Sequence, residues 1–324
     1  MRAPRRLLFV GILGLAVIGL LSAAAIALAT FIMAREGAPE RLRARTGTVV
    51  TAETHSVRSL DGSRLDDLTL RSSTGLSVHG LVRVPERGRP PYAGAIVVGG
   101  MKRGSRIVAA SGLDAIAREA VIVSPDYPLQ LRRDSWKGVR ALKTLARLRP
   151  AAFDIVAEVV LLMDYLASRP DVDPRRLFLV GGSLGAMAVT VAGGIDPRPA
   201  AVVVLYGGGR VGPLIAHTLE HPAQDVGLPH WAAPAVGRAL GWWLTPLSPE
   251  RYAPAIAPRA FIMINGDDDS LVPRQYARAL YQAARSPKEL VWMPGEHIEP
   301  SEAAVLERVA GVVTARLVAH GLLP

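Results

Sequence analysis

The chain has 324 residues, half of them hydrophobic and a fifth charged, a balance typical of a folded protein with a sizeable core. It contains no cysteine, which excludes disulfides, thiolate metal sites and a cysteine nucleophile. The formal net charge is +10, but the arginines are scattered along the chain and only four of the 38 basic residues are lysine. The charge indicates an arginine-rich surface, and we expect no nucleic-acid partner.

The first expected element is an apolar N-terminal helix. From Leu7 to Ala34 the chain carries no charged residue over 28 positions. As a helix this run would reach roughly 42 Å, which is enough to span a bilayer with tilt. The sequence therefore favours a membrane anchor over residues 1–34. The alternative is a cleaved signal sequence of a secreted protein, because small residues suited to cleavage occur at Ala23, Ala24 and Ala25.

Arginines both precede and follow the expected anchor, so the positive-inside rule does not decide its orientation. We expect a single-pass protein whose folded domain lies outside the cytoplasm. Residues 35–47 are predicted to form a polar tether, and residues 48–324 are predicted to form the folded domain.

From residue 48 onward the pattern alternates between strands and helices. The expected strands are 67–73, 76–85, 92–100, 121–128, 176–180, 200–208, 260–266 and 289–294. The expected helices are 111–120, 153–170, 184–194, 273–286 and 301–319. Because the later strands are apolar throughout and helices separate them, the sequence predicts an α/β fold with a mostly parallel sheet flanked by helices. Residues 208–258 are predicted to be an irregular cap insertion.

The pentad Gly181-Gly182-Ser183-Leu184-Gly185 lies between an expected strand and an expected helix. A Walker phosphate loop requires Lys and then Ser or Thr after its last glycine, where this chain has Ala and Met. A dinucleotide fingerprint requires a glycine where Ser183 stands, and no acidic residue ends the next strand. The remaining interpretation is a nucleophile elbow, in which a tight turn presents the Ser183 hydroxyl.

A serine nucleophile needs a base, and the base needs an orienting acid. One expected strand runs into Asp267-Asp268-Asp269, and another runs into Gly295-Glu296-His297. Taken alone, the three acids would be a solvated turn and His297 an ordinary loop residue. Together with Ser183, in this order and just past strand ends, they predict a catalytic triad.

These motifs make the chain similar to the α/β-hydrolase superfamily, especially to its dienelactone-hydrolase-like and prolyl-oligopeptidase-like branches. The resemblance covers residues 49–323 and rests on the elbow, on the run "RPDVDPRRLFLVGGSLGA" and on the run "INGDDDSLVP". It implies an α/β-hydrolase fold, with the acid three residues after the glycine of the second run. That register favours Asp269 as the acid.

The resemblance also implies an oxyanion hole made by the backbone N–H groups of Leu184 and Met101. Two positions depart from the superfamily. Gly99-Gly100 replaces a more usual His-Gly, and the loop of His297 reads Glu-His-Ile where His-Gly is common. Dienelactone hydrolases use cysteine, which this chain lacks, so their substrate is not expected here.

The expected cap carries histidines and tryptophans: His217, His221, His230, Trp231, Trp242 and Trp243. Three histidines raise the alternative of a metal site. No close ligand pair with a supporting carboxylate accompanies them, so we expect no metal and interpret the segment as a cap with its own small apolar core.

The sequence therefore predicts a membrane-tethered serine hydrolase that cleaves carboxylic esters or thioesters of a small-molecule acyl substrate, without a cofactor. Ser183 would attack the carbonyl, His297 would transfer the proton and Asp269 would orient the imidazole. The alternatives are an acyltransferase or a peptidase built on the same triad, and a non-catalytic binding module with a hydrolase fold. Substrate identity and oligomeric state are not encoded in any motif of the chain.

Overall fold

The computed structural model describes residues 38–60, 62–100, 104–129, 139–221, 231, 233–298 and 303–324. The chain divides into two compact units, Met1–Arg41 and Leu42–Pro324, and the second contains the sheet. The predicted membrane anchor, Leu7 to Ala34, lies outside the described residues. Within the described part of the chain, no helix combines the length and the apolar character that crossing a bilayer requires.

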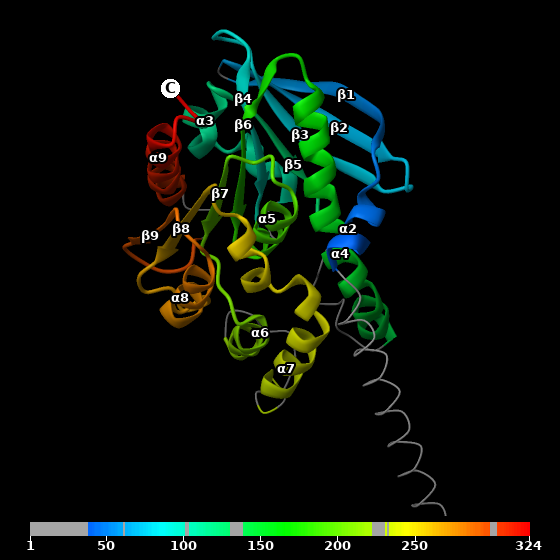
Figure 1. Cartoon of the computed structure of the whole chain (residues 1–324), viewed down its shortest axis with the longest axis vertical. Coiled ribbons are helices and arrows are strands. Elements are labelled where there is room, and N and C mark those ends of the chain that lie inside the picture. The colour runs from blue at the N-terminus through cyan, green and yellow to red at the C-terminus, as the bar shows by residue number, and fades with distance from the viewer. Residues whose placement is uncertain are drawn as a thin grey trace, which may run out of the picture. The chain divides into compact units, whose positions relative to one another are not determined.

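A nine-stranded sheet forms the centre of the second unit, in the order β1-β2-β3-β5-β4-β6-β7-β8-β9 (Figure 1). Strands β1, β2, β3 and β5 pair antiparallel, whereas β5, β4 and β6 to β9 pair in parallel. The mostly parallel sheet that the sequence predicts is therefore confirmed. The strands are β1 (Val49–Leu60), β2 (Ser63–Ser72), β3 (Ser77–Pro85), β4 (Tyr92–Val98), β5 (Ala120–Pro125), β6 (Val172–Gly182), β7 (Ala201–Leu205), β8 (Ala260–Gly266) and β9 (Lys288–Met293).

Helices cover both faces of this sheet (Figure 1). One face carries α4 (Val139–Ser168) and α5 (Leu184–Ile195), and the other carries η1 (Gly104–Ala109), η2 (Ser111–Leu113), α3 (Asp114–Ala117) and α9 (Ala303–Ala319). Strand β6 shows why both faces are covered. Successive residues of a strand point to opposite faces of the sheet, and apolar side chains of β6 point to both. Phe178 and Val180 join a buried cluster with Val313 of α9, whereas Leu177 and Leu179 are buried on the opposite face.

Arg83 on β3 is almost completely buried and joins η1 and α3 to the sheet. Its guanidinium donates to the Ser63 hydroxyl at 2.7 Å, to the Val108 carbonyl at 3.4 Å and to the Asp114 carboxylate at 2.6 Å. Buried charges persist only when paired and hydrogen-bonded, and Arg83 meets both conditions. The hydrogen bonds of Arg83 therefore hold η1 and α3 against the sheet.

The N-terminal side of the sheet differs from the sequence-based prediction. Most of the predicted polar tether, residues 35–47, is helix α2 (Ala38–Thr46). Leu42 of this helix is buried, and the Thr46 hydroxyl donates to the Leu42 carbonyl at 2.8 Å. The sequence also does not predict β1, because that edge strand is exposed along both faces and lacks an alternation of apolar and polar residues.

Two expected helices have different lengths in the structure. The helix expected at 111–120 is only η2 and the four-residue α3, where Gly112 packs directly against Leu306 of α9. The helix expected at 153–170 is α4, which begins fourteen residues earlier, at Val139. The added segment is rich in Arg, Leu and Ala, which favour helix without forming the apolar stripe that marks a buried helix in the sequence.

Residues 208–258, predicted to be irregular, contain α6 (Val211–Glu220) and α7 (Ala233–Trp243), followed by the short turns η6 (Thr245–Leu247), η7 (Pro249–Arg251) and η8 (Ala253–Ala255). The prediction was wrong because the glycines in this stretch serve helix packing. The backbones of α6 and α7 approach so closely that a Cβ on Gly237 or Gly241 of α7 would collide with Ala216 or Gly212 of α6. His230 of this stretch lies outside the described residues.

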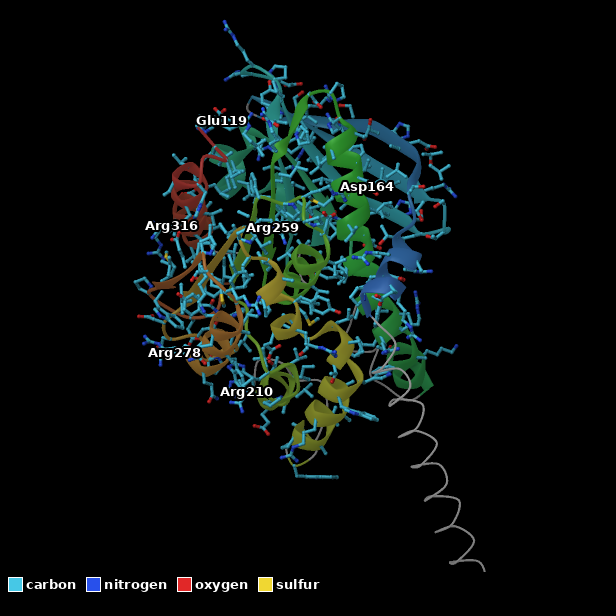
Figure 2. The ribbon with its side chains drawn as sticks, in the orientation of Figure 1. Glu119, Asp164, Arg210, Arg259, Arg278 and Arg316 are labelled. Atoms are coloured by element: carbon cyan, nitrogen blue, oxygen red, sulfur yellow. The ribbon has the colours of Figure 1, made fainter. Side chains whose placement is uncertain are left out.

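The arginines of the surface stabilise local structure. Figure 2 labels Arg210, Arg259, Arg278 and Arg316 on separate elements of the domain. The Arg316 guanidinium pairs with Glu289 at 2.9 Å. Arg259 donates to the Gly193 carbonyl at 2.7 Å, so its positive charge lies at the C-terminus of α5, where the helix dipole favours a cation.

Candidate active site

Ser183 occupies the turn between β6 and α5, with φ 53° and ψ −115°. This conformation is rare for a residue with a side chain, and it lifts the hydroxyl out of the line of the strand. The turn closes because of two glycines. A Cβ on Gly181 would collide with the Gly185 carbonyl, and a Cβ on Gly185 would collide with the Val98 carbonyl of β4. The glycines of the pentad therefore make the tight turn possible.

The structure brings Ser183, His297 and Asp269 together from three different loops. His297 Nε2 lies 3.1 Å from the Ser183 Oγ, and His297 Nδ1 lies 2.8 Å from Asp269 Oδ2. The Asp269 side chain is completely buried, and its other oxygen accepts the backbone N–H groups of Leu271 at 2.9 Å and Val272 at 2.7 Å. Asp269 is thus fixed with one oxygen directed at the imidazole.

The neighbouring acids have different partners. Asp267 accepts the backbone N–H of Gly295 at 2.9 Å and pairs with Arg274 at 3.6 Å. Asp268 is exposed. Among the three acids of this loop, the described contacts therefore direct only Asp269 at His297.

The His297 ring packs edge-on against Tyr206, with ring centroids 5.5 Å apart and planes at 76°. Tyr206 directly follows β7, is buried and has a φ of 52°. A residue held in this region costs about 1–3 kcal/mol and persists only where its surroundings fix it. Burial also raises the pKa of the Tyr206 hydroxyl. Sequence reasoning missed this residue, because nothing around Tyr206 marks its contact with His297.

The contacts of Glu296 account for the glutamate that precedes His297 in the unusual Glu-His-Ile sequence. Its carboxylate accepts the backbone N–H of Ser270 at 3.0 Å and the Ser270 hydroxyl at 2.8 Å. These hydrogen bonds hold the pKa of Glu296 below its usual value. Ser270 follows Asp269, and Glu296 precedes His297. The two bonds therefore join the loop that carries Asp269 (the acid loop) to the loop that carries His297 (the histidine loop).

Two histidines of the segment 208–258 contact the same loop. His217 Nε2 lies 2.8 Å from the Ser270 carbonyl, and His221 Nε2 lies 3.1 Å from the Ser270 hydroxyl. His217 lies in α6, and His221 directly follows the last residue of that helix. Among the described residues, no group of three or more His, Asp or Glu side chains is arranged to hold a metal ion. These histidines connect α6 to the loop that carries Asp269 and Ser270.

The backbone N–H of Leu184 begins α5 directly after Ser183, where the helix dipole favours negative charge. Met101, the second predicted oxyanion residue, lies outside the described residues. The described end of its loop lies close to the nucleophile, since a Cβ on Gly100 would be 3.6 Å from the Ser183 Cβ. The Tyr127 hydroxyl donates to the Gly99 carbonyl at 2.5 Å, and burial raises the pKa of this hydroxyl. Tyr127, which sequence reasoning missed, thereby anchors the loop.

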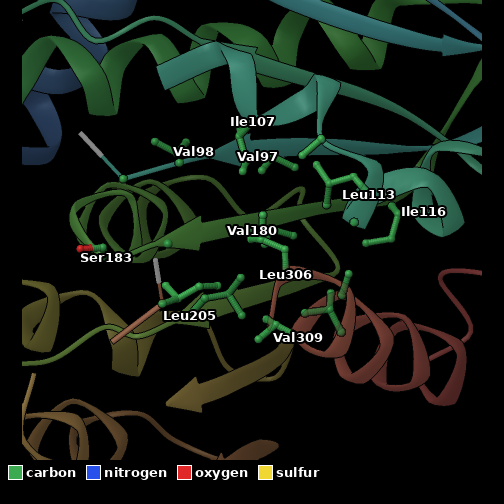
Figure 3. Close-up of a pocket in the computed structure, with 18 of the residues that line it drawn as sticks. Val97, Val98, Ile107, Leu113, Ile116, Val180, Ser183, Leu205, Leu306 and Val309 are labelled. Carbon is green, nitrogen blue, oxygen red and sulfur yellow. The ribbon is translucent and has the colours of Figure 1, made fainter. Parts of the chain in front are cut away.

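Two apolar cavities flank the elbow. The first, of about 180 Å³, lies between the sheet, η1, η2 and α9, and includes Ser183 and His297 in its wall (Figure 3). The second, of about 100 Å³, lies between α4, α5 and η6 and includes Leu184 and Met187. The nucleophile and the base therefore belong to the first cavity.

Comparisons with known proteins fit this architecture. No family model matches the chain. The uncharacterized protein YfhR of Escherichia coli (strain K12) is 28% identical over 152 residues, which are 46% of this chain and 48% of YfhR, so the match spans about half of that relative.

Solved structures cover more of the chain. Acetyl xylan esterase 1 from Thermoanaerobacterium sp. JW/SL YS485 has a TM-score of 0.66 at 16% identity, over 87% of this chain and 92% of that one. The acetyl xylan esterase from Paenibacillus sp. R4 has a TM-score of 0.62 at 17% identity, over 85% and 92%. The α/β hydrolase GrgF from Penicillium sp. sh18 has a TM-score of 0.51 at 14% identity, over 84% and 99%. The chain has the fold of the α/β-hydrolase superfamily.

Proposed function

We propose that this protein is a serine hydrolase that cleaves carboxylic esters or thioesters through an acyl-enzyme intermediate. The observation that carries the proposal is the chain of hydrogen bonds from the Ser183 hydroxyl through His297 to the buried Asp269 carboxylate. Structural neighbours named as esterases support ester bonds as the target, above the amide bonds of a peptidase.

The geometry suits each step of acyl transfer. His297 Nε2 accepts the Ser183 proton as Oγ attacks the carbonyl carbon, and His297 then donates that proton to the leaving alcohol or thiol. Asp269 stabilises the imidazolium that forms between these steps. The Leu184 N–H stabilises the oxyanion together with a donor from the loop that Tyr127 anchors, for which Met101 remains our candidate. Water attacks the acyl-enzyme in the second half of the cycle.

We also propose, on the sequence alone, that the uncharged run from Leu7 to Ala34 anchors this hydrolase in a membrane with its folded domain outside the cytoplasm. Cleavage of the run as a signal sequence is the alternative. An acyltransferase would use the same triad, with an alcohol replacing water in the second step.

One labelling experiment tests the nucleophile and the location together. A fluorophosphonate probe is applied to membrane and soluble fractions of cells that express the full chain. We expect one adduct per chain, at Ser183, in the membrane fraction, and no adduct in a folded Ser183→Ala variant. Absence of labelling in folded wild-type protein would favour the non-catalytic binding module. A labelled soluble protein whose N-terminus lies near residue 30 would show that the apolar run is a cleaved signal.

Tyr127 anchors the loop of Gly99 and Gly100, and this contact predicts the effect of Tyr127→Phe. The variant keeps the ring but loses the hydrogen bond to the Gly99 carbonyl, a bond worth about 1 kcal/mol. We expect kcat on an activated ester to fall about fivefold to tenfold while KM changes little, because the loop stabilises the transition state more than the bound ester. Steady-state kinetics with a melting curve checks this. A lowered melting temperature with wild-type kcat would show that Tyr127 serves stability alone.

A further inference from the structure

The first cavity has an almost wholly apolar wall. Among the described residues that line it, Ser183 and His297 are the only ones with polar side chains. The remaining wall consists of glycines, aliphatic side chains and Phe178. A sugar or peptide in such a space would leave its hydroxyl or amide groups without partners, which costs far more than the contacts return. The wall accepts a hydrocarbon.

The cavity leads from the accessible nucleophile into the core of the domain. Ser183 is partly exposed, whereas Ile116 and Val309, which also line the cavity, are each 2% exposed. Figure 3 shows Ser183 at one end of the lining residues, and Leu113 and Ile116 at the opposite end. An occupant attached to Ser183 would therefore extend along β6 toward η2 and α3.

We infer that this cavity holds the acyl chain of the substrate, and that the protein acts on esters of medium-length, unbranched fatty acids. This inference rests on the proposed function and specifies its substrate class. An engineered apolar cavity of about 150 Å³ holds the six carbons of benzene, so a cavity of about 180 Å³ has room for about six to eight carbons. An acetyl group would leave most of it empty.

The order of bond changes assigns the chain to the acyl side of the ester. When Ser183 Oγ forms its bond to the carbonyl carbon, the bond from that carbon to the alcohol oxygen breaks, and the alcohol leaves with the proton from His297. Water must then reach the carbon beside His297. An alcohol in the part of the cavity behind Ser183 would have to leave past the acylated serine, whereas an acyl chain stays there until water releases it. A cavity that extends behind Ser183 therefore suits the part that stays.

The second cavity is the competing place for a chain. It is smaller, and neither Ser183 nor His297 lines it. On the side of the elbow it is lined by Leu184, Met187 and Ala188 of α5. Leu148 of α4 lines this second cavity, and Leu113 of η2 lines the first, so the same leucine-to-phenylalanine change is available in each.

The test is a series of p-nitrophenyl esters from acetate to myristate, assayed below their aggregation limits with the full-length wild-type protein. Each methylene buried in an apolar site favours binding about fourfold. We expect kcat/KM to rise by about that factor per methylene up to hexanoate or octanoate, and then to fall as the chain exceeds the cavity. A series of acetate esters of longer alcohols should show no comparable rise. Highest kcat/KM on acetate, or a rise along the alcohol series only, would overturn the inference.

Two variants and a control locate the chain. Leu113→Phe shortens the far end of the cavity, and we expect the ratio of kcat/KM for octanoate to that for acetate to fall about tenfold. Leu113→Ala lengthens the cavity, and the best chain should become about two carbons longer; this variant keeps the test decisive where Leu113→Phe does not fold. Leu148→Phe should leave the octanoate-to-acetate ratio at its wild-type value. A reduced ratio in Leu148→Phe with an unchanged ratio in Leu113→Phe would assign the chain to the second cavity.

The two proposals fail in different ways. Covalent labelling of Ser183 by a fluorophosphonate with hydrolysis that does not depend on chain length would overturn the acyl-chain inference and leave the serine hydrolase in place. Absence of both labelling and hydrolysis in the folded protein would overturn the proposed function itself, and the acyl-chain inference with it.

Discussion

Replacing Ser183 with Ala or Gly is expected to lower kcat on an activated ester by about 10⁶-fold, because no other described residue lining the first cavity carries a hydroxyl that could take over the attack. The stabilities of the two variants should differ. Ser183 has φ 53° and ψ −115°, a conformation that costs a residue with a Cβ about 1–3 kcal/mol. Ala keeps this strain. Gly removes it, but adds about 0.5–1 kcal/mol of chain entropy to the unfolded state.

We therefore expect the free energy of unfolding of Ser183→Gly to exceed that of Ser183→Ala by about 1 kcal/mol. Urea unfolding of both variants, with wild type as reference, measures the difference. Wild-type stability in both variants would mean that the elbow stores no strain, and a kcat within tenfold of wild type would remove Ser183 from the chemistry.

The second large effect is expected for Asp269→Asn, with kcat about 10⁴-fold lower. The carboxylate holds His297 with Nδ1 protonated, which leaves Nε2 free to accept the Ser183 proton. An amide in its place lacks the charge that stabilises the imidazolium and offers an N–H where an acceptor is required. Because Asp269 also accepts two backbone N–H groups, kcat is compared only among variants with similar melting temperatures.

Asp268→Asn is the matched control, since Asp268 is exposed and adjacent. Its kcat should stay within about tenfold of wild type, as should that of Asp267→Asn, because neither side chain bonds to His297. A large loss of kcat in Asp268→Asn beside an active Asp269→Asn would show that Asp268, and not Asp269, orients His297 during the reaction.

The parts of the site that could be predicted are those with a local signature. Ser183 lies in a pentad whose glycines are required by sterics, and the acid and histidine loops follow apolar strands that are readable as strands. Because each of these loops follows the carboxyl end of a parallel strand, the loops are expected to meet at the same end of the sheet. The structure brings Ser183, Asp269 and His297 together at that end.

The supporting residues could not be predicted, because their contacts join segments that have no pattern in common. Tyr127 bonds to a carbonyl 28 positions away, and Glu296 bonds to Ser270 26 positions away. Neither residue has a sequence signature. The helices α6 and α7 were missed for a related reason. Their glycines lower local helix propensity, and only the close contact between the two backbones compensates for that loss.

The bonds from His217 and His221 to Ser270 limit how the segment between β7 and β8 can change. Surface insertions usually tolerate replacement and changes of length, because few contacts hold them. Here a redesigned or exchanged segment would also have to supply partners for Ser270, one residue from Asp269. Substitutions in this segment are therefore better placed in α7 than in α6, because its described contacts to Ser270 come from His217 and His221. A change in α6 would therefore require a matching change in the loop that carries Asp269 and Ser270.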